Sequence, residues 1–288
     1  MTPDPGYPGW TILTGAMPVD MDERTIQETL HSRHPAGKDP MGDGAMDAAV
    51  LLHSRWDEVE GFESDQDRGI PAPPAQPVPP ADAEIIELPP ADSDHAGPSL
   101  GRMLSDRRSR RSYSAGDLSI GELSFLLWAA QGLLKPLANQ AGFRTSPSGG
   151  ARHPLDTYVV VSRIAGIEPG LYVYLPDGHS LWRKAAHPGK EKLLEACNGQ
   201  AFAASAPVLV IWAAVPARSS WRYGPAAPKL VLLDAGHACE NLYLACEHLG
   251  LGTCAIGAYL QDESDRMLGL DGRSETTVYM APVGRRRG

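Results

Sequence analysis

Four arginines and two serines fall within seven residues, in the stretch Arg107–Tyr113 (RRSRRSY). A guanidinium presents a fixed fork of N–H donors that matches a phosphate, and a serine hydroxyl adds a short neutral donor beside it. Gly116, Asp117 and an apolar helical pattern follow, so the stretch lies at the entry to a folded domain. On these residues alone two interpretations stay open: a site for a phosphate monoester, or a basic surface patch.

The elements that would position this stretch alternate between helices and strands. Ser119 and Glu122 have the spacing of a capping box and open a helix that runs to about Leu134. Asp234 begins a long helix that Gly250 ends. Strands are expected at residues 157–162, 171–174, 208–214 and 276–281, and shorter helices at 189–197 and 262–268. The sequence therefore predicts an α+β domain, in which the almost wholly apolar third strand is covered on both faces.

The chain before this domain has a different composition. Residues 1–98 hold 5 Lys/Arg and 19 Asp/Glu, whereas residues 99–288 hold 21 and 16. Proline is dense near the end of the acidic part, where it removes backbone donors and favours an extended chain. We therefore predict three parts: residues 1–70 as an acidic extension, weakly structured or with small helices at 21–31 and 46–56; 71–98 as a Pro-rich linker or surface arm; and 99–288 as the folded domain.

Several classes of protein do not fit this composition. The excess of basic residues in the folded part is too small for nucleic-acid binding and suits a small anionic ligand. No stretch approaches the length of a membrane span, and Met1–Asp20 lacks the basic flank and apolar core of a secretion signal, so we expect a cytoplasmic protein. The four cysteines form no CxxC pair and no ligand spacing with histidine, so we expect no metal site.

Four segments, taken in order, carry a family resemblance: residues 107–113 with 118–132 (RRSRRSY, LSIGELSFLLWAAQG), 144–161 (RTSPSGGARHPLDTYVVV), 232–259 (LLDAGHACENLYLACEHLGLGTCAIGAY) and 281–287 (APVGRRR). Together they resemble the SagB/thiazole-oxazole dehydrogenase branch of the flavin-dependent nitroreductase superfamily. The resemblance covers roughly residues 85–288. It implies a nitroreductase-like central mixed β-sheet flanked by helices and an intertwined homodimer, with two FMN sites at the subunit interface.

The resemblance assigns the polar end of FMN to residues near the entry of the domain. Four residues would hold the phosphate and the ribityl oxygens: Arg107, Arg108, Ser109 and Arg111. Arg110 would point to solvent. At the end of the chain, Arg286 or its neighbour Arg285 would close on the phosphate, and a frayed, solvated end is the alternative.

The same resemblance places two Gly-rich segments on the flavin ring. One is the turn Pro147-Ser148-Gly149-Gly150-Ala151, which comes from the other subunit and lets backbone approach the flavin. The other lies in residues 252–258, where a backbone N–H approaches flavin N5, with Ile256 and Gly257 as its neighbours. An ordinary hairpin turn and a helix-to-strand loop are the alternatives that the residues alone would give.

Azoline-oxidising members of this branch carry an adjacent Lys-Tyr pair before the Asp-Ala-Gly-His helix. A base removes a ring proton while the neighbouring carbon gives hydride to FMN. Here the matching positions are Arg222 and Tyr223. Arginine cannot give up its proton at a usable pH, so Tyr223 is the candidate base, and Arg222 would favour its charged form. For Tyr223 the alternative is a half-buried aromatic side chain in a loop.

Three functions follow as hypotheses. The leading one is an FMN-dependent dehydrogenase of a peptide-derived natural product, by azoline-to-azole or related chemistry, whose acidic extension recruits the peptide or a partner biosynthetic enzyme. The second is an NAD(P)H-dependent nitro- or quinone reductase. The third is a non-catalytic scaffold subunit of a biosynthetic complex, which the arginine at position 222 favours and the intact arginine cluster opposes.

Overall fold

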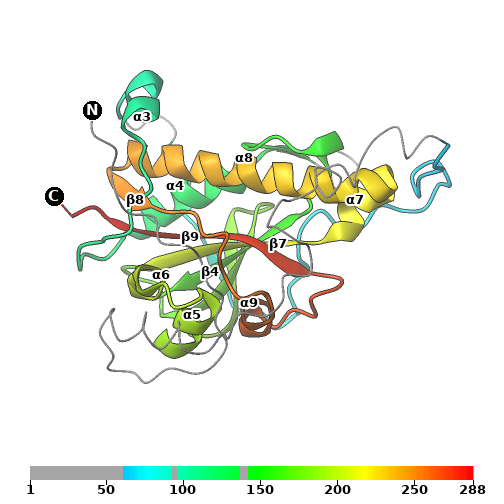
Figure 1. Ribbon diagram of the computed structural model, residues 1–288. Helices are drawn as coiled ribbons and strands as arrows, with labels where there is room; N and C mark the ends of the chain where they lie inside the picture. Colours follow the sequence, from blue (N-terminus) through cyan, green and yellow to red (C-terminus); the bar gives the residue numbers. More distant parts are fainter. Residues whose placement is uncertain (1–60, 93–95, 137–141, 288) are drawn as a thin grey trace, which may run out of the picture. The chain divides into compact units, whose positions relative to one another are not determined.

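A seven-stranded sheet runs through the part of the chain that the computed structural model describes, residues 61–92, 96–136 and 142–287 (Figure 1). The strand order is β1-β6-β5-β4-β7-β9-β8, and each neighbouring pair is antiparallel. The strands are β1 (Ile85–Glu87), β4 (Leu155–Val161), β5 (Gly170–Leu175), β6 (Ser180–Ala186), β7 (Val208–Ala214), β8 (Leu251–Thr253) and β9 (Thr276–Arg285). A separate two-stranded sheet joins β2 (Leu133–Pro136) to β3 (Gly142–Arg144).

Helices pack on both faces of the larger sheet (Figure 1). They are α3 (Leu100–Asp106), α4 (Ile120–Gln131), α5 (Lys190–Ala196), α6 (Ala201–Ser205), α7 (Pro216–Tyr223), α8 (Ala227–His248) and α9 (Gln261–Leu268). Val210 and Trp212 of β7 belong to one buried cluster with α4 and α8, whereas Leu209 and Ile211 belong to a second with α5, α6 and α9. Successive side chains of a strand point to opposite faces, so the apolar run predicted for this strand serves two cores. The α+β class is confirmed.

The start of α4 is set by the residues that predicted it. The Ser119 hydroxyl accepts the backbone N–H of Glu122 at 3.1 Å, and the Glu122 carboxylate accepts the backbone N–H of Ser119 at 2.7 Å. These bonds satisfy two backbone donors that a helix start would otherwise leave unpaired. The helix ends at Gln131 rather than near Leu134, because the chain becomes extended at Gly132 and enters β2.

The predicted start of the long helix was also wrong. Helix α8 begins at Ala227, well before Asp234, because Pro228 occupies the first turn, where its missing N–H costs no helical hydrogen bond. Tyr223 is the last residue of helix α7, so it does not lie in a loop, which was the alternative considered for it.

The N-terminal third is described in part. The helices predicted at 21–31 and 46–56 lie outside the described residues. Within the predicted Pro-rich linker, β1 pairs with β6 and forms one edge of the sheet, so this segment contributes to the sheet. No helix in the described ranges has both the length and the apolar character needed to cross a membrane.

Candidate functional site

The arginine cluster (residues 107–111) follows α3 and lies against the C-terminal half of α8. The Ser109 hydroxyl is 3.0 Å from that of Tyr243, and the Arg107 guanidinium lies 5.3 Å from the centre of the Tyr243 ring. The backbone N–H of Arg110 donates to the carbonyl of Thr253 at 2.9 Å. Helix α8 and strand β8 therefore fix the cluster from two sides.

The cluster contains guanidinium groups without acidic partners. Among the described residues, no carboxylate oxygen lies within 4.0 Å of the side-chain nitrogens of Arg107, Arg108 or Arg111. Arg110, expected to point to solvent, instead approaches the buried carboxylate of Glu247 at 3.8 Å. The expectation for Arg110 was wrong, because the fold buries the Glu247 carboxylate beside its side chain. The remaining positive charge is available to an anion.

Tyr243 joins this cluster to the second predicted segment. Its hydroxyl accepts the backbone N–H of Ala255 at 2.8 Å while it also contacts Ser109. Burial raises the pKa of Tyr243, so the hydroxyl stays protonated and neutral. Sequence reasoning missed this residue, since a tyrosine within an apolar helical stripe reads as core. The sequence did show that this tyrosine lies on the predicted helix directly before the predicted flavin-facing segment, residues 252–258.

The loop after β8 holds Ile256 and Gly257 in different ways. The backbone N–H of Ile256 donates to the carbonyl of Met280 at 2.7 Å, and its side chain is buried. That N–H is therefore already used within the fold. Gly257 is exposed, and open space surrounds the position of a Cβ. Of the two predicted neighbours of flavin N5, Gly257 is the one that a planar ring can approach.

The C-terminal arginines are paired within the chain. Arg285 forms two hydrogen bonds with Glu122, of 3.1 and 3.0 Å. Arg286 pairs with Glu247 at 2.5 Å and donates to the carbonyl of Leu251 at 2.7 Å. Arg286 thus shares its carboxylate with Arg110 next to the arginine cluster, but its charge is compensated in this conformation. Its contact with a phosphate stays a prediction.

The predicted turn from Pro147 to Ala151 lies next to the predicted catalytic residues Arg222 and Tyr223. A Cβ built on Gly150 would come within 2.4 Å of the Tyr223 hydroxyl and 3.2 Å of Arg222 Cδ. Gly150 also has a φ of +56°, so glycine is favoured there on both grounds. The backbone N–H of Gly149 donates to the Asp234 carboxylate at 3.3 Å, which ties the turn to α8.

The end of α7 carries a high local positive charge. The Arg222 guanidinium is exposed and lies 5.6 Å from the centre of the Tyr223 ring. Arg152 lies over the ring of Trp221 at 4.8 Å. Burial lowers the pKa of Arg152, and the neighbouring charge of Arg222 lowers it further. An anionic or proton-losing group beside Tyr223 would be stabilised by this field.

A single chain does not bring the arginine cluster close to the Pro147–Ala151 turn and Tyr223. Gly149 packs near Leu230 at the start of α8, whereas the arginine cluster packs on Tyr243. At a rise of about 1.5 Å per residue, these two positions on α8 are about 20 Å apart. Figure 1 shows α7 at one end of α8, with α3 and β8 at the other.

Comparison with known proteins identifies the fold. The family described as "Nitroreductase family" matches residues 104–285. The chain belongs to the nitroreductase family. A Methanocaldococcus jannaschii protein named as a nitroreductase is 37% identical over 187 residues, which is 65% of this chain and 91% of that protein. The trifolitoxin-processing protein TfxB of Rhizobium leguminosarum bv. trifolii is 39% identical over 110 residues, 36% of this chain and 30% of that protein.

A solved structure agrees with this family. A nitroreductase-like crystal structure from Ralstonia eutropha has a TM-score of 0.60 at 29% identity, covering 74% of this chain and 94% of that one. The predicted nitroreductase-like fold, a sheet flanked by helices, is therefore confirmed, and the chain is a nitroreductase-family oxidoreductase. The residues before 104 lie outside the region that matches the nitroreductase family.

Proposed function

We propose that the chain is an FMN-dependent dehydrogenase that oxidises part of a peptide-derived natural product. The observation that carries this proposal is the arginine cluster, in which Arg107, Arg108 and Arg111 have no carboxylate partner among the described residues. Bound FMN would supply the acceptor for a hydride at N5. The protein's contribution is to bind the cofactor, orient the substrate and take up a proton.

The residues present fit the polar end of FMN. Hydrogen bonds from guanidinium groups to a phosphate are charge-assisted, and Ser109 offers a hydroxyl among them. The Tyr243 hydroxyl contacts both Ser109 and the backbone N–H of Ala255. It would therefore fix the distance between the residues that bind the phosphate and the loop that faces the flavin ring. In that loop, the open space at Gly257 leaves room for the flavin ring.

A homodimer would complete the site. The turn at Pro147–Ala151 and Tyr223 lie about 20 Å along α8 from the arginine cluster of their own chain, so a second chain is needed to supply them. Leu232 and Leu233 of α8 are 61% and 53% exposed, although the helix packs its other face in the core. Exposed leucines of this kind on a long helix favour an interface with another chain.

The deprotonated side chain of Tyr223 is the proposed base, and the proton it takes up restores its hydroxyl. Its hydroxyl lies against the Gly150 turn, and Arg222 holds a fixed positive charge beside its ring. Arginine keeps its proton, so it acts by charge and position and does not serve as the base. Similarity to TfxB, which is named as processing trifolitoxin, supports a peptide-derived substrate and a partner in peptide biosynthesis.

Two other functions have support. The M. jannaschii relative, which this chain spans over 91% of its length, favours an NAD(P)H-dependent nitro- or quinone reductase. A scaffold subunit is favoured by the arginine at position 222, where a lysine would be expected of an azoline oxidase.

The visible absorption spectrum of the purified protein, recorded before and after NADPH, separates the three. A flavin spectrum that NADPH does not bleach supports the dehydrogenase. Rapid bleaching by NADPH identifies a reductase. A colourless protein that also fails to take up added FMN leaves the scaffold.

A further inference from the structure

A segment that spans the end of the acidic extension and the start of the Pro-rich linker contacts the helix α7, which carries the proposed base. We name residues 61–79 the strap. The backbone N–H of Gln66 donates to the carbonyl of Trp221 at 3.1 Å, and the indole N–H of Trp221 donates to the carbonyl of Ile70 at 2.7 Å. Trp221 is separated from Tyr223 by one residue. The strap is thus hydrogen-bonded to the last turn of α7.

The strap also contacts the residue that follows Tyr223. Gly224 has a φ of +46°, and a Cβ built on it would lie 2.3 Å from two ring atoms of Phe62. The Phe62 ring therefore rests directly on the backbone at the end of α7. Because any side chain at Gly224 would displace that ring, the two residues fit each other as a pair.

The strap holds its own shape at this contact. Asp67 Oδ2 accepts the Ser64 hydroxyl at 2.6 Å and the Ser64 backbone N–H at 3.1 Å, and the Asp67 N–H returns to the Ser64 hydroxyl at 3.1 Å. These bonds lower the pKa of Asp67, and the charge of Arg222 adds to the effect. A carboxylate is therefore placed within the field of Arg222, while Asp65 pairs with Arg68.

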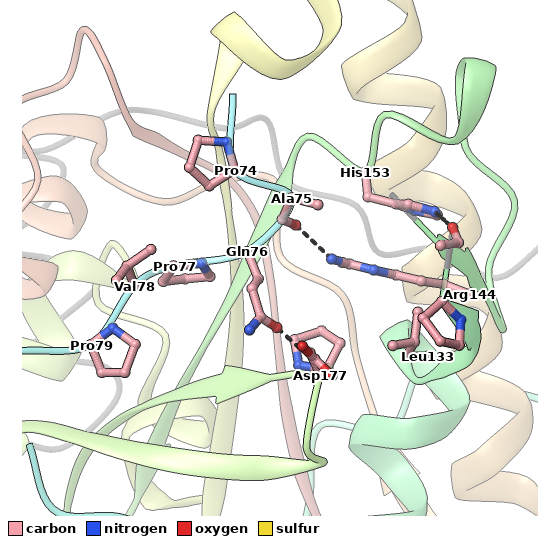
Figure 2. A pocket seen from close by; sticks show the side chains of 13 residues that line it. Pro74, Ala75, Gln76, Pro77, Val78, Pro79, Leu133, Arg144, His153 and Asp177 are labelled. Atoms are coloured by element: carbon pink, nitrogen blue, oxygen red, sulfur yellow. Dashed lines mark hydrogen bonds between the residues drawn. The ribbon is translucent and has the colours of Figure 1, made fainter. Parts of the chain in front are cut away.

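Two buried arginines hold the rest of the strap. Arg218, on α7, forms two hydrogen bonds of 2.5 and 3.1 Å with Asp156, and its Nε donates to the carbonyl of Pro74 at 2.7 Å. Arg144 donates to the next carbonyl, that of Ala75, at 2.7 Å, as Figure 2 shows. Because proline has no N–H, its carbonyl is the backbone group through which this part of the strap can be held.

The strap leaves a cavity of about 440 Å³ beneath it, which separates it from the hairpin of β2 and β3. In Figure 2 the side chains of Arg144 and Gln76 face this space, and Gln76 accepts the backbone N–H of Asp177 at 2.9 Å. The strap is therefore held at separate points, through Phe62, Trp221, Arg218, Arg144 and Gln76, rather than by continuous packing. Removal of one of these contacts should therefore change the structure near that contact and leave the others in place.

We propose that the strap is a positioning element of the active site, which fixes the end of α7 and with it the side chains of Arg222 and Tyr223. This inference rests on the proposed function for the role of Tyr223 as the base. The contacts with α7 do not depend on it. The strap precedes residues 104–285, which match the nitroreductase family, so the family match does not account for it.

A fluorine NMR experiment tests the placement of Tyr223 directly. The full-length protein is labelled with 3-fluorotyrosine at its nine tyrosines, and the Tyr223 signal is assigned from its loss in Tyr223→Phe. In Phe62→Ala we expect that signal to shift or broaden, and in Phe62→Tyr to return to its original position. Phe143→Ala is the matched control, because Phe143 is 53% exposed and Phe62 is 45% exposed. It should leave the signal unchanged.

Trp221→Phe provides a second variant. It removes the indole donor to Ile70 and keeps an aromatic ring under Arg152, and it should also move the Tyr223 signal. It decides the question if Phe62→Ala fails to fold. A Tyr223 signal that is the same as in the wild type in the folded variants overturns the proposal. The signal requires neither flavin nor substrate. Absence of FMN from the protein would therefore contradict the proposed function and leave the strap intact.

Discussion

The hydroxyl oxygens of Ser109 and Tyr243 lie 3.0 Å apart, although 134 residues separate them in the sequence. Through the same Tyr243 hydroxyl, the N–H of Ala255 is drawn toward the arginine cluster. Tyr243 would thus link the residues proposed to bind the FMN phosphate to the loop proposed to face the flavin ring.

Tyr243→Phe should weaken FMN binding while the fold is retained. The variant keeps the buried ring and removes two hydrogen bonds, each of which contributes about 1 kcal/mol. We expect a loss of affinity of up to roughly 30-fold. Titration of the apoprotein with FMN, followed by quenching of flavin fluorescence, measures it. Tyr259→Phe, which loses only a bond to the Thr277 carbonyl, should bind FMN like the wild type. Equal affinities for both variants would contradict the role of Tyr243.

Mixed dimers should show that each FMN site uses two chains. One chain carries Arg107→Ala with Arg111→Ala, and the other carries Pro147→Trp, which adds bulk at an exposed position of the turn. A site built from two chains leaves one intact FMN site in this dimer. If all three substitutions lie in one chain and its partner is wild type, both sites are damaged.

FMN released from tagged, purified mixed dimers measures this difference. The expected content is near one FMN per dimer in the first arrangement and near none in the second. The opposite pattern would place the whole site within one chain. Homodimers of each variant serve as the baseline.

Acid should destabilise the protein through His153. Burial lowers the pKa of His153 to about 4, with the nearby Arg144 charge also lowering it, against about 6.5 in an unfolded chain. Between these values the unfolded state binds more protons, so the free energy of unfolding falls as the pH drops from about 6.5 to about 4. The linked loss is roughly 3 kcal/mol.

Urea unfolding at a series of pH values measures this loss. His153→Asn should flatten the curve between pH 6.5 and pH 4, since asparagine does not titrate and tolerates the φ of +47° at this position. His237→Asn, an exposed substitution on α8, should keep the wild-type slope. A slope that survives in His153→Asn would assign the acid sensitivity to other groups.

Local patterns predicted much of the fold. The capping box of Ser119 and Glu122 and the apolar run in β7 depend on residues a few positions apart, so the sequence contains the whole signal. The start of α8 was missed because Pro228 is compatible with both a loop and a first helical turn, and packing decides between them.

The site was predicted less completely, because its contacts join distant residues. Glu247 pairs with Arg110 and Arg286, and no spacing in the sequence indicates a carboxylate buried at the end of α8. The backbone N–H of Ile256 donates to the carbonyl of Met280 on β9. This bond depends on how the loop lies beside β9, which the Gly-rich sequence of the loop does not indicate. The arginine cluster was visible because its members are adjacent.

The content of FMN in the purified protein tests the central claim most directly. The chromophore is released by denaturation, identified and counted in the wild type, in Arg107→Ala with Arg111→Ala, and in a control with Arg163→Ala and Arg183→Ala, which removes two arginines paired with carboxylates elsewhere. We predict FMN in the wild type and the control. Affinity in the cluster variant should fall roughly 100-fold or more, because hydrogen bonds to charged groups contribute about 1.5–3 kcal/mol each. Unchanged FMN content in the cluster variant would contradict the assignment of this site.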